Sequence, residues 1–98
     1  MLHIPEDPVH PGRILFDDFL EDYGLAIDKV AADTGIAESE LTAIEAGKAG
    51  ISAETALRLS RYFSNSPEFW LNLQRTYDLS VAQKTATGLD RIQPVHAA

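Results

Sequence analysis

The stretch IDKVAADTGIAESELTAIEA, residues 27–46, decides the fold of this chain. Small Ala31 stands where two helices would cross closely, and Gly35 stands in the turn between them. A larger side chain at residue 31 would push the helices apart, and a Cβ at residue 35 would strain the turn. The pattern is typical of a helix-turn-helix. Taken by itself, it is equally typical of a plain helical hairpin. Its expected inner face consists of Val30, Ile36, Leu41 and Ile44.

Glycine and proline residues mark the boundaries of further predicted helices along the chain. The stretch quoted above predicts helices over about residues 27–34 and 38–46, which end at Gly35 and Gly47. An earlier helix should begin at Pro11 and end at Gly24, where Leu25 turns back onto it. The apolar face expected for this first helix consists of Leu15, Phe16, Phe19, Leu20 and Tyr23.

Two more helices are predicted in the second half of the chain. Ser52 is typical of the residue that caps a helix N-terminus, and that helix should run to about Phe63 and be closed by Asn65. Its expected inner residues are Ala56, Leu59, Ser60 and Phe63. Ser66-Pro67-Glu68 is the strongest helix start in the sequence. The inner stripe of this fifth helix is predicted to be Phe69, Trp70, Leu73 and Tyr77.

Length and composition indicate one all-α domain. Ninety-eight residues with 45% apolar content suffice for a single core. We expect residues 1–9 to form an N-terminal arm, residues 10–87 the helical domain and residues 88–98 a loose tail. Because apolar runs are short and the first residues are acidic, neither a membrane span nor a signal peptide is predicted, and we expect a cytoplasmic protein.

Charge is distributed unevenly along the chain, whose net charge is −7. Residues 1–47 hold eleven acidic and two basic side chains, whereas residues 48–98 hold four acidic and six basic ones. A net negative charge opposes binding to nucleic-acid phosphates. The acidic half is interpreted either as solvated helix faces or as a surface that steers a basic protein partner.

Several short motifs surround the helix-turn-helix. They are His10-Pro11-Gly12, Gly24-Leu25, GKAGIS at residues 47–52, ALRL at residues 56–59, FWLNLQ at residues 69–74 and YDL at residues 77–79. In this order and spacing, over about residues 8 to 82, the chain resembles the HigA-type antidote family of toxin–antitoxin modules. The resemblance implies a five-helix domain of the phage-repressor type. Such a protein is expected to form a homodimer, bind its own operator DNA and neutralise a small, basic ribonuclease toxin.

The helix-turn-helix pattern assigns the expected DNA contacts. The groove-facing positions are Ala37, Glu38, Ser39, Glu40, Thr42 and Ala43. The family commonly has Arg, Asn or Ser there, so the two glutamates are a departure: each can accept from a cytosine amino group, but together they repel phosphates. The compensating bases are expected to be Lys29, Lys48 and Arg58, although Lys48 is equally explained as a partner of the helix dipole. Ala26 and Ala37 stand where the family often has a capping serine.

Two other surfaces are candidates for protein contacts. Leu71 and Arg75 lie on the fifth helix away from its inner stripe and are predicted to form the dimer interface, the alternative for Leu71 being a lone exposed leucine. Four acidic side chains lie one turn apart on the polar side of the first helix. These candidate toxin-binding residues are Asp17, Asp18, Glu21 and Asp22. The alternative is that they form only a solvated helix face.

The sequence indicates no catalytic or metal chemistry. Its three histidines are isolated, and His10 is interpreted as a capping or packing residue. GKAG at residues 47–50 lacks the other residues of a phosphate loop. We therefore expect no enzyme activity, no metal and no cofactor. The alternative to an operator-binding antitoxin is an interaction module of the same fold, with weak or lost DNA binding, whose acidic half engages a basic partner.

Overall fold

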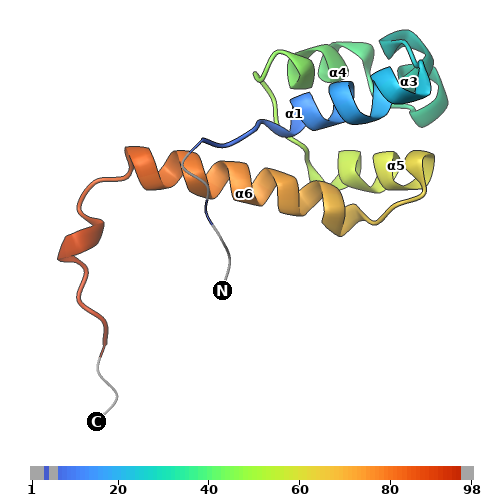
Figure 1. Ribbon diagram of the computed structural model, residues 1–98. Coiled ribbons are helices and arrows are strands. Elements are labelled where there is room, and N and C mark those ends of the chain that lie inside the picture. The colour runs from blue at the N-terminus through green and yellow to red at the C-terminus, as the bar shows by residue number, and fades with distance from the viewer. Residues whose placement is uncertain (1–3, 5–6, 96–98) are drawn as a thin grey trace.

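The structure, a computed structural model, describes residue 4 and residues 7–95, and within these residues all regular secondary structure is helical. Its elements are α1 (Pro11–Arg13), η1 (Ile14–Leu20), α2 (Glu21–Tyr23), α3 (Ile27–Thr34), α4 (Glu38–Glu45), α5 (Ala53–Phe63), α6 (Pro67–Thr85) and η2 (Leu89–Arg91). The all-α prediction is confirmed, because α1, η1 and α2 follow one another as a single rod and complete the five predicted helices. Helix α6 packs on α5 and α1 and projects beyond them (Figure 1). Within the described residues, no helix is both long enough and apolar enough to cross a membrane.

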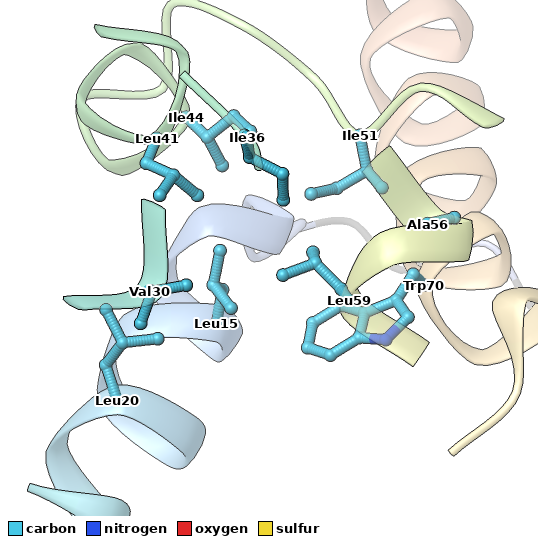
Figure 2. Packing of buried hydrophobic residues seen from close by; sticks show 10 residues of the cluster. All are labelled: Leu15, Leu20, Val30, Ile36, Leu41, Ile44, Ile51, Ala56, Leu59 and Trp70. Atoms are coloured by element: carbon cyan, nitrogen blue, oxygen red, sulfur yellow. The ribbon is translucent and has the colours of Figure 1, made fainter. Parts of the chain in front are cut away.

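The core is formed where the helices converge (Figure 2). Its buried apolar residues are Leu15, Leu20, Val30, Ile36, Leu41, Ile44, Ile51, Ala56, Leu59 and Trp70. The predicted inner face of the helix-turn-helix is therefore confirmed in full. Burying each of the larger side chains stabilises the fold by about 1.5–3 kcal/mol.

The first helix differs from the prediction in its hydrogen bonding. Residues of η1 form a π-helix, in which a backbone N–H bonds to the carbonyl five residues before it, as Glu21 does to Phe16. This wider turn places Leu15 and Leu20, five residues apart, in the core, while Phe19 is only half-buried. The prediction that Tyr23 lies on the inner face is wrong: its side chain is 63% exposed. The helix ends at Gly24 in the left-handed conformation, as predicted.

The turn between α5 and α6 also corrects the sequence analysis. Ser64, not Asn65, adopts the left-handed conformation that closes α5. Asn65 instead uses its Oδ1 to accept a hydrogen bond of 2.9 Å from the buried indole Nε1 of Trp70. Phe69 was predicted to be an inner residue of α6, but it is 38% exposed and packs edge-on against Trp70. The buried stripe of α6 therefore centres on Trp70, which has a polar partner for its N–H.

The His10-Pro11-Gly12 motif joins three parts of the fold. The Nδ1 of His10 accepts a hydrogen bond of 3.0 Å from the backbone N–H of Gly12, which caps α1 as predicted. The imidazole ring lies edge-on to Tyr77 of α6, with ring centroids 4.8 Å apart. A Cβ on Gly12 would collide with the backbone carbonyl of Ile44 in α4, so only glycine permits this approach.

Gln74 explains why two distant motifs occur together. Its Oε1 accepts a hydrogen bond of 2.7 Å from the backbone N–H of Ile51, in the loop before α5. A Cβ on Gly50 would lie within 3 Å of the same amide group. The GKAGIS loop and the FWLNLQ run thus form one joint between the α4–α5 loop and α6.

Candidate nucleic-acid interface

The turn between α3 and α4 is fixed by side chains on both sides. Gly35 is left-handed, with φ of 78°, and Thr34 bonds through its hydroxyl to the backbone N–H of Ile36. Arg58 of α5 donates from Nη1 to the carbonyl of Thr34 at 2.9 Å. A Cβ on Gly35 would lie 2.8 Å from that same Nη1. The two helices are thereby held at a defined angle, which a recognition helix requires.

The first turn of α4 presents small and polar side chains outward. Of the predicted groove-facing residues, Ala37, Glu38, Ser39 and Thr42 are exposed and Ala43 is half-buried. No side chain caps the N-termini of α3 and α4, where Ala26 and Ala37 stand. At α3 the backbone N–H of Lys29 donates to Oδ1 of Asp28 at 2.9 Å. At α4 no side chain accepts from the first backbone N–H groups, which leaves them available for an anion.

Glu40 is the predicted groove-facing residue that the structure places differently. Its carboxylate accepts a short hydrogen bond from the hydroxyl of Thr55, and Thr55 is buried in α5. The Thr55 hydroxyl also accepts a hydrogen bond from the Ser52 side chain, which caps α5. Glu40 therefore joins α4 to the N-terminus of α5. The sequence could not reveal this role, because the partner lies fifteen residues away on another helix.

Lys29, a predicted phosphate contact, is engaged within the protein. Its Nζ lies 3.0 Å from Oδ2 of Asp33, which also accepts a hydrogen bond of 2.6 Å from the Tyr62 hydroxyl. The bond from Tyr62, followed by that from Lys29, lowers the pKa of Asp33, and bonding to Asp33 raises the pKa of Lys29 and of Tyr62. The charge of Lys29 is partly neutralised by this pairing.

Arg58 and Lys48, the other two bases predicted to contact phosphate, differ in whether they have partners within the protein. Arg58 is committed to the Thr34 carbonyl and to Glu54, whose Oε2 lies 3.2 Å from its Nε. Lys48, which follows α4, is exposed and forms no ion pair within the described residues. Lys48 is thus the better placed of the two to contact phosphate.

The predicted protein-contact residues lie on the surface. Leu71 is exposed, and Arg75 donates from Nη2 to Oδ1 of Asn72 at 2.8 Å. Further along α6 an apolar groove of about 280 Å³ was missed by the sequence analysis, because the chain beyond Gly88 shows no periodicity. The groove is lined by Ile4, Leu79, Ala82, Gln83, Ala86 and Leu89.

The acidic residues on η1 and α2 are exposed as well. They are Asp17, Asp18, Glu21 and Asp22. Arg13 pairs with Asp17 at 3.2 Å, and the other three form no ion pair in the part of the chain that is described. Within the same described residues, no three histidine or acidic side chains are grouped so that they could hold a metal ion.

Known proteins of similar sequence and structure identify the family. A helix-turn-helix family model matches residues 18–70. Virulence-associated protein I of Dichelobacter nodosus is 37% identical over 87 residues, which cover 89% of this chain and 81% of that protein. An addiction module antidote protein of the HigA family from Coxiella burnetii has a TM-score of 0.81 and 37% identity, over 90% of this chain and 98% of the other. The chain belongs to the HigA-type helix-turn-helix family.

One HigA relative has been solved with nucleic acid. The Pseudomonas aeruginosa antitoxin HigA, in a structure with the higBA promoter, matches with a TM-score of 0.80 and 34% identity. The match covers 92% of this chain and 100% of that protein. The family resemblance predicted from the motifs is confirmed.

Proposed function

We propose that this HigA-type protein represses its own operon by binding operator DNA as a homodimer, and that it neutralises a basic ribonuclease toxin in the cytoplasm. The observation that carries the proposal is the rigid α3–α4 unit, whose uncapped first turn of α4 faces outward with small side chains. A helix presented in this way can enter the major groove with its N-terminal residues against base edges. The solved relative with promoter DNA supports the same assignment.

Base recognition is proposed to rest on the exposed residues of α4. Ser39 and Thr42 can donate to or accept from bases, and Ala37 and Ala43 leave room for a thymine methyl group. Glu38 can accept from a cytosine amino group, at the cost of repelling nearby phosphates. The bond between Glu40 and Thr55 directs the second carboxylate toward α5 and not toward a base.

Phosphate contacts are proposed for Lys48, for the backbone N–H groups at the uncapped N-terminus of α4 and, more weakly, for Lys29. Because Lys29 is paired with Asp33, that carboxylate partly neutralises the positive charge that Lys29 offers to phosphate. The number of available bases is small for a DNA-binding protein. We therefore expect weak non-specific binding and a shallow dependence on salt.

Dimerisation is proposed to use one face of α6. Leu71, Arg75 and Leu79 follow one another at helical spacing and lead into the apolar groove at the end of the helix. Two exposed leucines on one face beside an apolar groove favour an interface over the alternative of a lone exposed leucine. A second copy bound there would supply the second recognition helix that a two-fold operator requires.

Toxin capture is proposed to use the acidic side of the first helix. Asp18, Glu21 and Asp22 carry charges that no described ion pair neutralises. They lie in the half of the chain that holds eleven acidic and two basic residues. Such a surface accelerates association with a basic protein and loses this effect as salt rises.

One pair of measurements tests both functions. Gel shifts with a duplex from the chain's own promoter should show a dimer complex that an unrelated duplex does not displace. Co-expression with the short basic reading frame beside its gene should abolish the growth arrest that this frame causes alone. Absence of a promoter complex together with toxin binding would favour the alternative, an interaction module that has lost DNA binding.

A further inference from the structure

The first helical rod and α5 both end on the side of the domain away from the projecting part of α6 (Figure 1). A pocket of about 400 Å³ is formed where these two helix ends meet. Its lining residues are Tyr23, Leu25, Tyr62, Phe63 and Ser64. The proposed operator contacts of α4 and the proposed dimer face of α6 do not include any of these residues.

One aromatic ring of this pocket is presented to solvent, and the other two are half-buried behind it. Tyr23, whose side chain is 63% exposed, stacks on Phe63 with ring centroids 5.7 Å apart and planes 22° from parallel. Tyr62 packs edge-on to the same Phe63, at 5.0 Å. The Tyr62 hydroxyl donates to Asp33, which increases the electron density of that ring. Exposed, electron-rich aromatic faces attract cations.

The backbone around the pocket adds negative potential. Tyr23 is the last residue of the first helical rod, and Phe63 is the last residue of α5. The C-terminal end of each helix carries a partial negative charge, so two such ends meet at one pocket. Ser64, at φ of 57°, is the only non-glycine residue with positive φ in the described chain, and its strained position lies in the same wall.

The charged side chains near the pocket leave this potential negative. Glu21 and Asp22 directly precede Tyr23 and form no ion pair in the described residues. Two of the neighbouring bases already have partners, since Lys29 pairs with Asp33 and Arg58 with Glu54. Arg61 on α5 is the remaining cation close by. Among the charged residues next to the lining residues, one cation and two carboxylates therefore lack an ion pair in the described residues.

We infer that this pocket receives an arginine or lysine side chain of the basic toxin. The inference rests on the proposed toxin neutralisation and names the contact that would anchor it. The cation would lie against the ring of Tyr23, with Glu21 and Asp22 at the rim. The acidic residues further back on the rod, Asp17 and Asp18, would guide the toxin toward this anchor.

The test compares substitutions at Tyr23 by calorimetric titration with the ribonuclease encoded beside the gene. Tyr23→Phe keeps the aromatic face and should bind within about twofold of wild type, whereas Tyr23→Leu should bind about threefold to thirtyfold more weakly. Ile92→Ala, at an exposed apolar residue beyond η2 that lines neither pocket, is the control and should bind as wild type does. Circular dichroism of each variant confirms that it is folded.

The outcomes separate the anchor from the function. If wild type does not bind the ribonuclease, toxin neutralisation is wrong and the anchor is wrong with it. If wild type binds and Tyr23→Leu binds equally well, the anchor alone is overturned. A nona-arginine peptide followed by NMR gives a second readout: the ring signals of Tyr23 and Tyr62 should shift first. Shifts confined to Asp17 and Asp18 would also overturn the inference.

Discussion

The Glu40 carboxylate on α4 accepts a hydrogen bond from the Thr55 hydroxyl on α5. Thr55 is buried, so an unpaired hydroxyl there would cost about 1–3 kcal/mol. Glu40 therefore joins α4 to α5, although the helix-turn-helix pattern predicts that it faces DNA. The two glutamates of α4 should therefore respond differently to substitution.

Glu38→Gln should raise affinity for every duplex, because it removes an exposed carboxylate from the phosphate side of α4. Glu40→Gln should raise affinity less, because the Glu40 side chain is directed toward Thr55 and the amide oxygen can still accept there. Fluorescence anisotropy with promoter and scrambled duplexes measures both variants. Equal gains for the two variants would show that Glu40 faces phosphate after all.

Replacing Glu40 by leucine should instead destabilise the protein. The Thr55 hydroxyl would lose its acceptor, and we expect a loss of about 1–3 kcal/mol in the free energy of unfolding. Urea denaturation followed by the fluorescence of Trp70 measures it. Thr55→Val combined with Glu40→Leu is the control, since it removes both partners and should recover part of the loss.

His10 should make stability fall with acid. Burial lowers the pKa of His10 below its ordinary value, and the nearby Asp78 carboxylate opposes this only in part. Since the unfolded chain then binds the proton more tightly, stability is full above an ordinary histidine pKa of about 6.5 and is lost as pH falls through it. Protonated Nδ1 can no longer accept from the Gly12 N–H.

Urea midpoints of wild type and His10→Asn at about pH 7.5 and about pH 5.5 check this prediction. Asparagine can also cap a helix but does not titrate in this range, so its midpoint should fall less. Parallel changes for the two proteins would assign the acid sensitivity to other groups.

Gln74→Leu should cost about 1–3 kcal/mol of unfolding free energy, because the backbone N–H of Ile51 loses its acceptor in a part-buried place. Gln74→Glu alone would keep an acceptor oxygen but lose the 2.9 Å bond from Nε2 to Asp78 and bring two carboxylates together. It is therefore combined with Asp78→Asn, and this double variant should cost less than Gln74→Leu. Thermal unfolding followed by circular dichroism compares them. A loss equal for both would mean that the amide's packing against Gly50 matters more than the bond.

Leu79→Glu should yield a folded monomer with reduced operator affinity, because it places a charge in the apolar groove of α6. Leu71→Glu, at the start of the same stripe, should weaken the dimer less because Leu71 does not line the groove. Light scattering with circular dichroism measures both. A Leu79→Glu protein that stays dimeric would place the interface elsewhere.

The sequence could predict the features that depend on local periodicity. Val30, Ile36, Leu41 and Ile44 repeat at helical spacing, and the glycine-closed helix ends follow from backbone sterics alone. The lack of a capping side chain at the N-termini of α3 and α4 could also be predicted, because alanine stands at both N-cap positions.

What escaped prediction depends on distant contacts or on hydrogen bonding that periodicity does not encode. The π-helical turns shift the buried face of the first helix by one residue, and so Tyr23 moves outward. Asn65 is drawn away from the helix end by the indole of Trp70, and Ser64 takes its place. Glu40 finds its partner on a different helix.

The central claim, that the first turn of α4 reads the operator, is tested most directly by the affinity ratio between promoter and scrambled duplexes. Wild type should prefer the promoter by at least about a thousandfold at physiological salt. The double variant Ser39→Ala, Thr42→Ala should lose at least about tenfold of that preference while its affinity for scrambled DNA stays unchanged. A wild-type ratio near unity, or a double variant with the wild-type ratio, would contradict the claim.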